Sequence, residues 1–377
     1  KSSYLGQHFR TSWENQNIIT FAHHQLKQQR YDEANMNYIK LIQKRVNEYR
    51  ESKHLSDDPL VADLQKALEL DRVLENLDER ILYSKDESVF EGGIAGPVCF
   101  PLTTEEVQAI MKIAEKHDRH VIPRGAGSGL AGGAIPLGAP IVIAMTKMNN
   151  ILEVDTDNRI AWVEPGVINL ELSDYLKPFG FHYAPDPSSQ QICTLGGNVA
   201  NNSGGPHCLA DGVTDTHVLA LEVVLPNGEV TIFGGLDAEP AGLDLRGAFI
   251  GSEGTLGITT KIAVRLTPNP DDVQTLLISF PSMRKAAETV SAIIADGIVP
   301  AAMEAMDQKT IEVIEKHIPS GYPTDAGAVL LVEVEGLVDG VEIEALRIGE
   351  IAENYGASDI KIAQTSYQRD ALWKGRK

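Results

Sequence analysis

The spacing of apolar positions changes twice along the chain and divides it into three parts. Up to about residue 55 the sequence is polar and helical, with an amphipathic stretch over residues 32–44. From Val121 onward, short apolar runs alternate with turn residues and predict strands. After Pro270, strand-sized and helix-sized segments alternate, which is typical of an α+β unit whose sheet is covered on one face by helices.

Two helices are expected before the strands. Ser56-Asp-Asp-Pro59 combines a capping serine, acidic residues and a proline, and it predicts a helix through Leu70. Thr103 begins a second helix, which runs to about His117 and buries a stripe of apolar residues. Strands are expected over residues 120–122, 141–144, 160–163 and 258–266.

A β-hairpin is expected over residues 218–233. The apolar runs 218–225 and 229–233 flank Pro226-Asn-Gly228, and Asn-Gly suits the positive φ angles of a tight turn. Beyond Pro268-Asn-Pro270 we expect strands over residues 276–280, 329–334 and 360–363, and helices over residues 283–295 and 341–355. The chain ends at Arg376-Lys377, inside what the pattern predicts to be a new helix. We therefore expect a fragment of a longer polypeptide whose last domain is incomplete.

Length and charge restrict the class of protein. A chain of 377 residues is long for one core, so two or more domains are expected. The net charge of −20 argues against a nucleic-acid partner, although one or two arginines can still bind a carboxylate. No apolar run approaches the ~20 residues of a membrane span. The three cysteines lack CxxC spacing and favour a reducing cytoplasm, while the start at Lys1 leaves a removed leader open.

Three glycine-rich segments carry the candidate chemistry. The first, residues 123–133, follows a predicted strand and has five glycines within nine residues. Uncovered backbone N–H groups of this kind bind a pyrophosphate, although a flexible surface loop is the alternative. The spacing is not the GxGxxG of a dinucleotide-binding βαβ unit, and no Gly-Lys-Ser/Thr ends it as in a P-loop.

The second and third segments contain residues suited to a large ligand. Residues 185–189 and 194–205 are dense in glycine, asparagine and serine, yet they include Leu195 and Val199. Small residues would let the backbone lie against a planar ligand while asparagine and serine contact its polar edge; a turn-rich loop is the alternative. In the third segment, residues 251–258, Glu253 is either a ligand contact or a local cap.

Together these motifs resemble the FAD-linked oxidase family. PRGAGSGLAGG, then PDPSS with TLGGNVANNSGG, then GSEGTLGI follow the order of the flavin domain shared with vanillyl-alcohol oxidase and p-cresol methylhydroxylase. Within the family, the resemblance is to the D-subunit of bacterial glycolate dehydrogenase and to D-lactate dehydrogenases, over roughly residues 60–377. The resemblance implies an α+β fold: a two-part FAD-binding domain of the p-cresol methylhydroxylase (PCMH) type over residues 56–269, then an incomplete α+β cap (substrate) domain over residues 270–377. Residues 1–55 are a helical extension of unknown role.

The resemblance also implies the residues that bind FAD. The pyrophosphate would lie on the main-chain N–H groups of Gly125, Ala126, Gly127, Ser128 and Gly129. The isoalloxazine and ribityl chain would be lined by Pro187, Ser188, Thr194, Gly197, Asn198, Asn201, Ser203 and Gly204. The adenine side would be closed by Glu253, Gly257 and Ile258. Non-covalent FAD is expected because no histidine lies in the first glycine loop.

A substrate residue is implied near the chain end. The stretch 370–377 resembles the part of the family that supplies an arginine to the substrate carboxylate, and that position is Arg376; a solvated helix arginine is the alternative. The family's histidine-rich metal site lies further along, so a divalent metal is expected only beyond Lys377. His207, Cys208, Asp211 and His217 fit no familiar metal spacing, and we expect His207 near the flavin.

The implied reaction is the oxidation of a small D-2-hydroxy acid, glycolate or D-lactate, to its 2-keto acid by hydride transfer to flavin N5. Electrons would then pass to a partner subunit, and the protein would be cytoplasmic or peripheral at the membrane through such partners. One alternative is an enzyme of the same fold that acts on D-2-hydroxyglutarate or an alkyl-glycerone-phosphate precursor. The other is a non-catalytic flavin-binding subunit.

Overall fold

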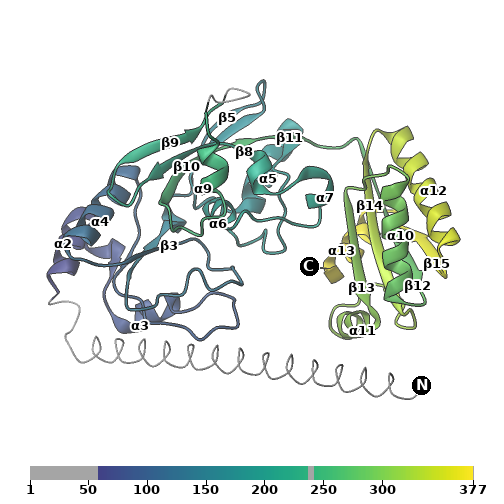
Figure 1. Ribbon diagram of the computed structural model, residues 1–377, viewed down its shortest axis with the longest axis horizontal. Coiled ribbons are helices and arrows are strands. Elements are labelled where there is room, and N and C mark those ends of the chain that lie inside the picture. Colours follow the sequence, from purple (N-terminus) through teal and green to yellow (C-terminus); the bar gives the residue numbers. More distant parts are fainter. Residues whose placement is uncertain (1–57, 237–241, 377) are drawn as a thin grey trace, which may run out of the picture.

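The computed structural model describes residues 58–236 and 242–376, which form two lobes. The first lobe contains the elements up to β11 and the second those from β12 onward; the chain crosses between the lobes once (Figure 1). The helical extension expected over residues 1–55, with Ser56, lies outside the described residues. Among the residues described, no helix is long and apolar enough to cross a membrane.

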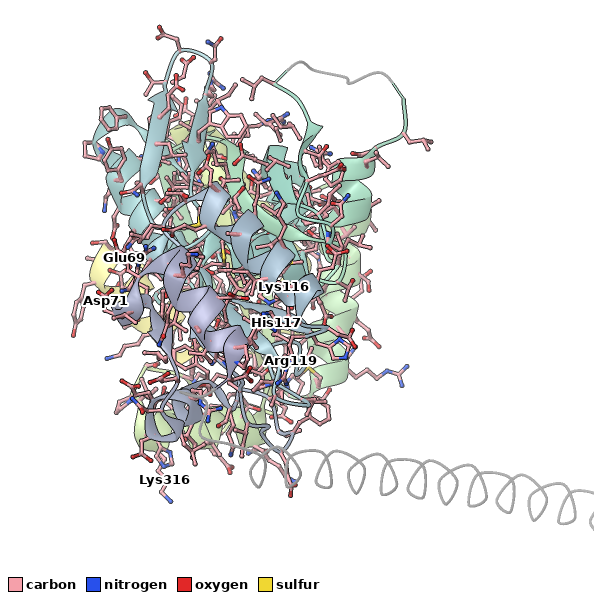
Figure 2. All side chains as sticks on the ribbon, turned by 90° about the vertical axis from the view of Figure 1, so that its left-hand side faces the viewer. Glu69, Asp71, Lys116, His117, Arg119 and Lys316 are labelled. Atoms are coloured by element: carbon pink, nitrogen blue, oxygen red, sulfur yellow. The ribbon has the colours of Figure 1, made fainter. Side chains whose placement is uncertain are left out.

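The first lobe begins with two helices packed on a mixed sheet. Helices α2 (Pro59–Leu68) and α4 (Thr104–Lys116) bury their apolar stripes against one face of the sheet. Thr103 caps α4 as expected, and Asp58 caps α2, which ends two residues earlier than Leu70. Lys116 and His117 lie at the end of α4 (Figure 2), and both contact the Asp63 carboxylate on α2. The strand order is β1 (Val73–Leu74), β2 (Val98–Cys99), β4 (Ile141–Ala144) and β3 (Val121–Arg124).

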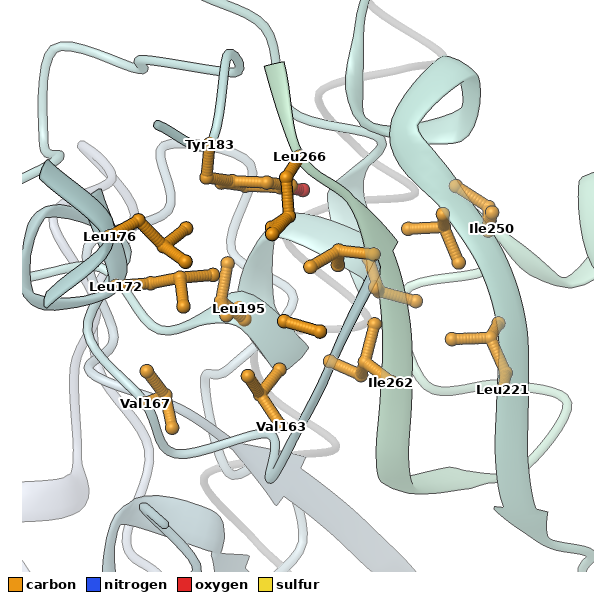
Figure 3. Packing of buried hydrophobic residues seen from close by; sticks show 14 of the residues in the cluster. Val163, Val167, Leu172, Leu176, Tyr183, Leu195, Leu221, Ile250, Ile262 and Leu266 are labelled. Atoms are coloured by element: carbon orange, nitrogen blue, oxygen red, sulfur yellow. The ribbon is translucent and has the colours of Figure 1, made fainter. Parts of the chain in front are cut away.

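A five-stranded antiparallel sheet forms the other half of this lobe. Its order is β5 (Ile151–Asp155), β6 (Ile160–Val163), β10 (Ile258–Arg265), β8 (Val218–Val224) and β9 (Val230–Gly234). The predicted hairpin is confirmed: β8 pairs with β9, and Gly228 takes a φ of +79° in the turn. Helices α5 (Asn169–Leu176) and α6 (Leu195–Asn201) pack on this sheet through leucine and valine side chains (Figure 3). The short strands β7 (Phe181–His182) and β11 (Thr267–Pro268) pair with each other. The short helices of this lobe are α3 (Leu77–Arg80), α7 (Cys208–Asp211), α8 (Thr214–His217) and α9 (Leu245–Phe249).

The second lobe is an antiparallel sheet with helices on both faces. Its strands run in the order β13 (Ala302–Asp307), β14 (Ala328–Gly336), β12 (Asp272–Phe280) and β15 (Asp359–Ile362). Helices α10 (Met283–Ala295) and α12 (Val338–Asn354) cover one face, while α11 (Gln308–His317) and α13 (Ser366–Arg376) pack on the other. The expectation of one covered face is therefore wrong, because β14 is buried on both sides over most of its length. The pattern also missed β13 and α11.

Candidate functional site

A cavity of about 450 Å³ lies in the first lobe, where three glycine-rich segments meet. Its walls come from the loop after β3, from the chain that leads into and through α6, and from the residues that precede and begin β10. These are the same three segments that the sequence singled out, although long stretches of chain separate them. The convergence produces one site whose lining is rich in glycine and in small polar residues.

Fifteen of the sixteen residues expected to bind FAD line this cavity; the exception is Ser188, whose neighbour Ser189 lines it instead. Placement in the wall does not test a contact with the cofactor, so the binding roles stay predictions. The fifteen are Gly125, Ala126, Gly127, Ser128, Gly129, Pro187, Thr194, Gly197, Asn198, Asn201, Ser203, Gly204, Glu253, Gly257 and Ile258.

The glycines of the first loop are required by neighbouring protein atoms. Gly127 has a φ of +77°, and a Cβ there would overlap the guanidinium of Arg124. A Cβ on Gly125 would overlap Oγ1 of Thr194. Beside Gly129, by contrast, a Cβ would meet nothing within 4 Å. The first two glycines thus let the loop lie close to β3 and α6, while open space lies beside the third.

Helix α6 presents two different faces. Leu195 and Val199 enter the core of the five-stranded sheet, while Gly197 and Asn201 line the cavity. Thr194 caps the helix, since its Oγ1 accepts a hydrogen bond from the Gly197 N–H at 3.2 Å. A helix over these residues was not predicted from the sequence. The signal for a helix was present in the capping threonine and the i, i+4 spacing of the two apolar residues.

Polar groups that were not predicted from the sequence also reach the cavity. Arg124, at the end of β3, lines it and is only 8% exposed; burial lowers the pKa of its guanidinium. Asp86 Oδ2 and Ser252 Oγ are buried in the cavity wall and have no hydrogen-bond partner among the described residues. Buried polar atoms are nearly always satisfied, so these two atoms fit a polar ligand that fills the space. Arg124 offers a positive charge beside the glycine loop, which suits a pyrophosphate.

A second polar cluster joins the two lobes. The His207 ring lies between two carboxylates, with Nδ1 2.8 Å from Asp186 Oδ2 and Nε2 3.2 Å from Glu333 Oε1. Burial lowers the pKa of His207, but the hydrogen bonds to both carboxylates outweigh it and raise the pKa to about 10. His207 is not among the residues that line the cavity, and its expected place near the flavin stays a prediction. Glu333 was missed, although a glutamate within the apolar run of β14 could have indicated it.

Arg376 lies on the second lobe at the end of α13. Its Nε is 2.8 Å from Oε2 of Glu304 on β13, and the Arg376 side chain is about one-third exposed. It is not among the cavity-lining residues, and its role toward a substrate carboxylate stays a prediction. Within the described residues, no group of three or more histidine, cysteine, aspartate or glutamate side chains is arranged to hold a metal ion.

A glycine-rich cavity with a buried arginine and unpartnered polar atoms in its wall is typical of a protein that binds a phosphate-bearing cofactor. Residues 96–234 match the family model described as an FAD binding domain, and residues 269–377 match that of the C-terminal domain of FAD linked oxidases. The chain therefore belongs to the FAD-linked oxidase family, and its cofactor is FAD. This confirms the family and the α+β fold class predicted from the motifs. The boundaries after residues 55 and 269 stay predictions.

Similar proteins agree with this assignment. The chain is 42% identical to the glycolate oxidase subunit GlcD of Escherichia coli (strain K12), over 74% of this chain and 56% of that protein. It is 33% identical to the D-lactate dehydrogenase of Anaerostipes hadrus, over 78% of this chain and 64% of that protein. A solved structure of p-cresol methylhydroxylase with substrate bound superposes with a TM-score of 0.72 at 19% identity, over 86% of this chain and 70% of that one. The chain thus spans little more than half of the first of these relatives.

Proposed function

We propose that this chain is the FAD-binding body of a dehydrogenase that oxidises glycolate or D-lactate to the corresponding 2-keto acid. The observation that carries the proposal is the convergence of the three glycine-rich segments on one cavity, in a chain whose second lobe carries Arg376. The similarity to a glycolate oxidase subunit and to D-lactate dehydrogenase supports these two acids as substrates.

The first lobe would hold FAD without a covalent bond. We assign the pyrophosphate to the main chain of residues 125–129, with Arg124 as the counter-charge. Asp86 and Ser252 would each gain a partner from the polar parts of the cofactor. When bound, FAD supplies a flavin N5 that accepts a hydride from C2 of the hydroxy acid. No histidine lies in the first glycine loop to make a covalent link.

Arg376 would bind the substrate carboxylate. Its ion pair with Glu304 is made through Nε, so the terminal nitrogens Nη1 and Nη2 are the pair that would form a fork with a carboxylate. Glu304 would hold the plane of the guanidinium in a fixed orientation. An anchored carboxylate holds the substrate in the site with C2 toward the flavin, so its loss should appear mainly as weaker substrate binding.

The electrons would leave through another protein. The E. coli relative is named as a subunit of glycolate oxidase, which supports an assembly of several chains. We propose that the acceptor lies on a partner subunit and that such partners would bring this chain to the membrane surface from the cytoplasm. Co-purification of the full-length protein with flavin-reoxidising partners would test this assembly.

A visible spectrum and a substrate titration test the function. The purified full-length protein should show the absorption bands of oxidised flavin, and these should bleach when glycolate or D-lactate is added without oxygen. Arg376→Gln should keep its FAD but raise KM for both acids by about a hundredfold or more, because the bidentate contact is lost. Arg376→Lys should have a KM between those of the wild type and Arg376→Gln. A protein that keeps FAD yet never bleaches would support a non-catalytic flavin-binding subunit. Bleaching only with D-2-hydroxyglutarate would change the substrate, and absence of flavin bands would overturn the proposal.

A further inference from the structure

We infer that His207 is a positioning residue, which joins the first lobe to Glu333 and thereby fixes helix α13 and Arg376 relative to the FAD cavity. The inference rests on the proposed function, because it concerns how the substrate-binding arginine is held. It goes beyond that function in assigning a role to the polar cluster between the lobes. His207 itself would touch neither substrate nor cofactor.

Asp186, His207 and Glu333 form a hydrogen-bonded bridge between the lobes. The first-lobe end of this bridge is next to the cavity. Asp186, which binds His207 Nδ1, directly precedes the cavity-lining Pro187. The chain at Gly205 packs so closely on Asp186 that a Cβ there would overlap its backbone carbonyl. The imidazole is therefore attached to the same segment that forms the cavity wall, and a displacement of one would displace the other.

The second-lobe end of the bridge is the carboxylate of Glu333. Only 6% of Glu333 is exposed, and its side chain lies on the α13 side of β14. One oxygen accepts the hydrogen bond from His207 Nε2, and the other accepts from Thr275 Oγ1 at 2.5 Å and from Trp373 Nε1 at 2.6 Å. Three donors from three segments leave this carboxylate little freedom to move.

Helix α13 transmits this position to Arg376. Trp373 lies three residues, about one helical turn, before Arg376. Gly375 packs against Tyr322, whose hydroxyl donates a hydrogen bond to the Leu372 carbonyl. Figure 1 shows α13 on the side of the second-lobe sheet that faces the first lobe. The end of the helix is thus fixed on its own sheet and, through Glu333 and His207, to the other lobe.

The positive charge of His207 compensates the carboxylates that meet between the two lobes. His207 is the positive group between Asp186 and Glu333, and hydrogen bonds to both keep it charged. Glu335, further along β14, is another partly buried carboxylate whose pKa is raised by burial and lowered by His207; Asp211 also acts on it. Without the imidazolium, the partly buried Asp186 and the buried Glu333 would face each other uncompensated, and the lobes would separate or take up water.

The test uses the full-length holoenzyme and three variants. His207→Gln removes the charge, and Trp373→Phe removes only the indole N–H that holds α13 to Glu333. The double variant His207→Gln/Glu333→Gln removes both charges. It should recover part of the substrate affinity that His207→Gln loses, and therefore have a lower KM than that variant. The matched control is His182→Gln, another first-lobe histidine, whose Nδ1 contacts Asn269 Oδ1 at 3.1 Å. Each protein is assayed with glycolate and D-lactate as probes and an artificial electron acceptor, and its FAD content is measured.

The expected result separates positioning from folding. His207→Gln and Trp373→Phe should raise KM about tenfold with a kcat change below about threefold and full FAD content, since a misplaced anchor weakens substrate binding. His182→Gln should leave KM unchanged. If His207→Gln does not fold, Trp373→Phe decides by the same readout. Unchanged KM in the folded variants, together with a raised KM in Arg376→Gln, overturns the bridge and leaves the proposed function standing. Unchanged KM in Arg376→Gln overturns the carboxylate anchor and the bridge with it.

Discussion

Two independent constraints exclude a side chain at Gly127, and a substitution there tests both of them. Its φ of +77° costs a non-glycine residue about 1 kcal/mol, and a Cβ would displace the Arg124 guanidinium from beside the cavity. Gly127→Ala should therefore lower the free energy of unfolding by about 3 kcal/mol and lower the FAD retained per protein. Urea unfolding and the ratio of flavin to protein absorbance measure the two effects.

Gly138 supplies the control for this substitution. It has a φ of +79°, but a Cβ there would meet nothing within 4 Å. Gly138→Ala should lower the free energy of unfolding by only about 1 kcal/mol, the effect of the positive φ alone, and should keep its full FAD content. Equal effects of the two substitutions would show that the contact with Arg124 has no part in cofactor binding.

At the scale of the element, local chemistry explains which predictions succeeded. Helix α4 and the β8–β9 hairpin were predicted closely because a capping threonine and an Asn-Gly turn act over a few residues. Helix α6 was missed because its glycines and asparagines are poor helix formers, and packing of Leu195 and Val199 on the sheet overrides that propensity. Strand β13 was missed because alanine, methionine and glutamate give it a weak strand signal.

Glu106 gives a prediction at this scale, because one side chain joins two elements. In the first turn of α4 it receives two hydrogen bonds from the Arg72 guanidinium, at 2.5 and 2.7 Å, and one from the Leu102 N–H. Arg72 is only 7% exposed, so Glu106→Gln leaves a buried cation poorly compensated. We expect a loss of about 2 kcal/mol in the free energy of unfolding, measured with urea at pH 7.

The neighbouring Glu105 is the control for Glu106, since it is exposed in the same helical turn. Glu105→Gln should cost no more than about 0.5 kcal/mol. Burial raises the pKa of Glu106, but the hydrogen bonds from Arg72 and from the Leu102 N–H, together with the charge of Arg72, outweigh it, so the pKa is lowered from its ordinary 4.5. The stabilisation is then complete above pH 4.5 and is lost as the pH falls through the lowered value. A Glu106→Gln effect that did not shrink in acid would contradict this ion pair.

At the scale of the whole molecule, the sequence indicated which segments matter but not where they meet. The three glycine segments could be assigned to one ligand only through their resemblance to a family, since no local rule brings residues 125, 197 and 253 together. The bridge between the lobes was out of reach for the same reason. Asp186, His207 and Glu333 belong to three segments, and their pairing depends on how two separately folded cores pack.

The contact between the lobes should lose its contribution to the stability of the protein at alkaline pH. In the folded state the pKa of His207 is raised from its ordinary 6.5 to about 10, so the charged bridge stabilises the native protein fully below pH 6.5. This contribution is lost as the pH rises toward 10. The difference in Tm between wild type and His207→Gln should therefore be largest near pH 6 and close to zero above pH 10. Arg347→Gln is the control, because the charges of Arg347 and Asp296 on the second lobe do not change between these pH values. Its Tm difference should stay flat, and a His207→Gln difference that was equally flat would mean that the imidazole is not the charged link between the lobes.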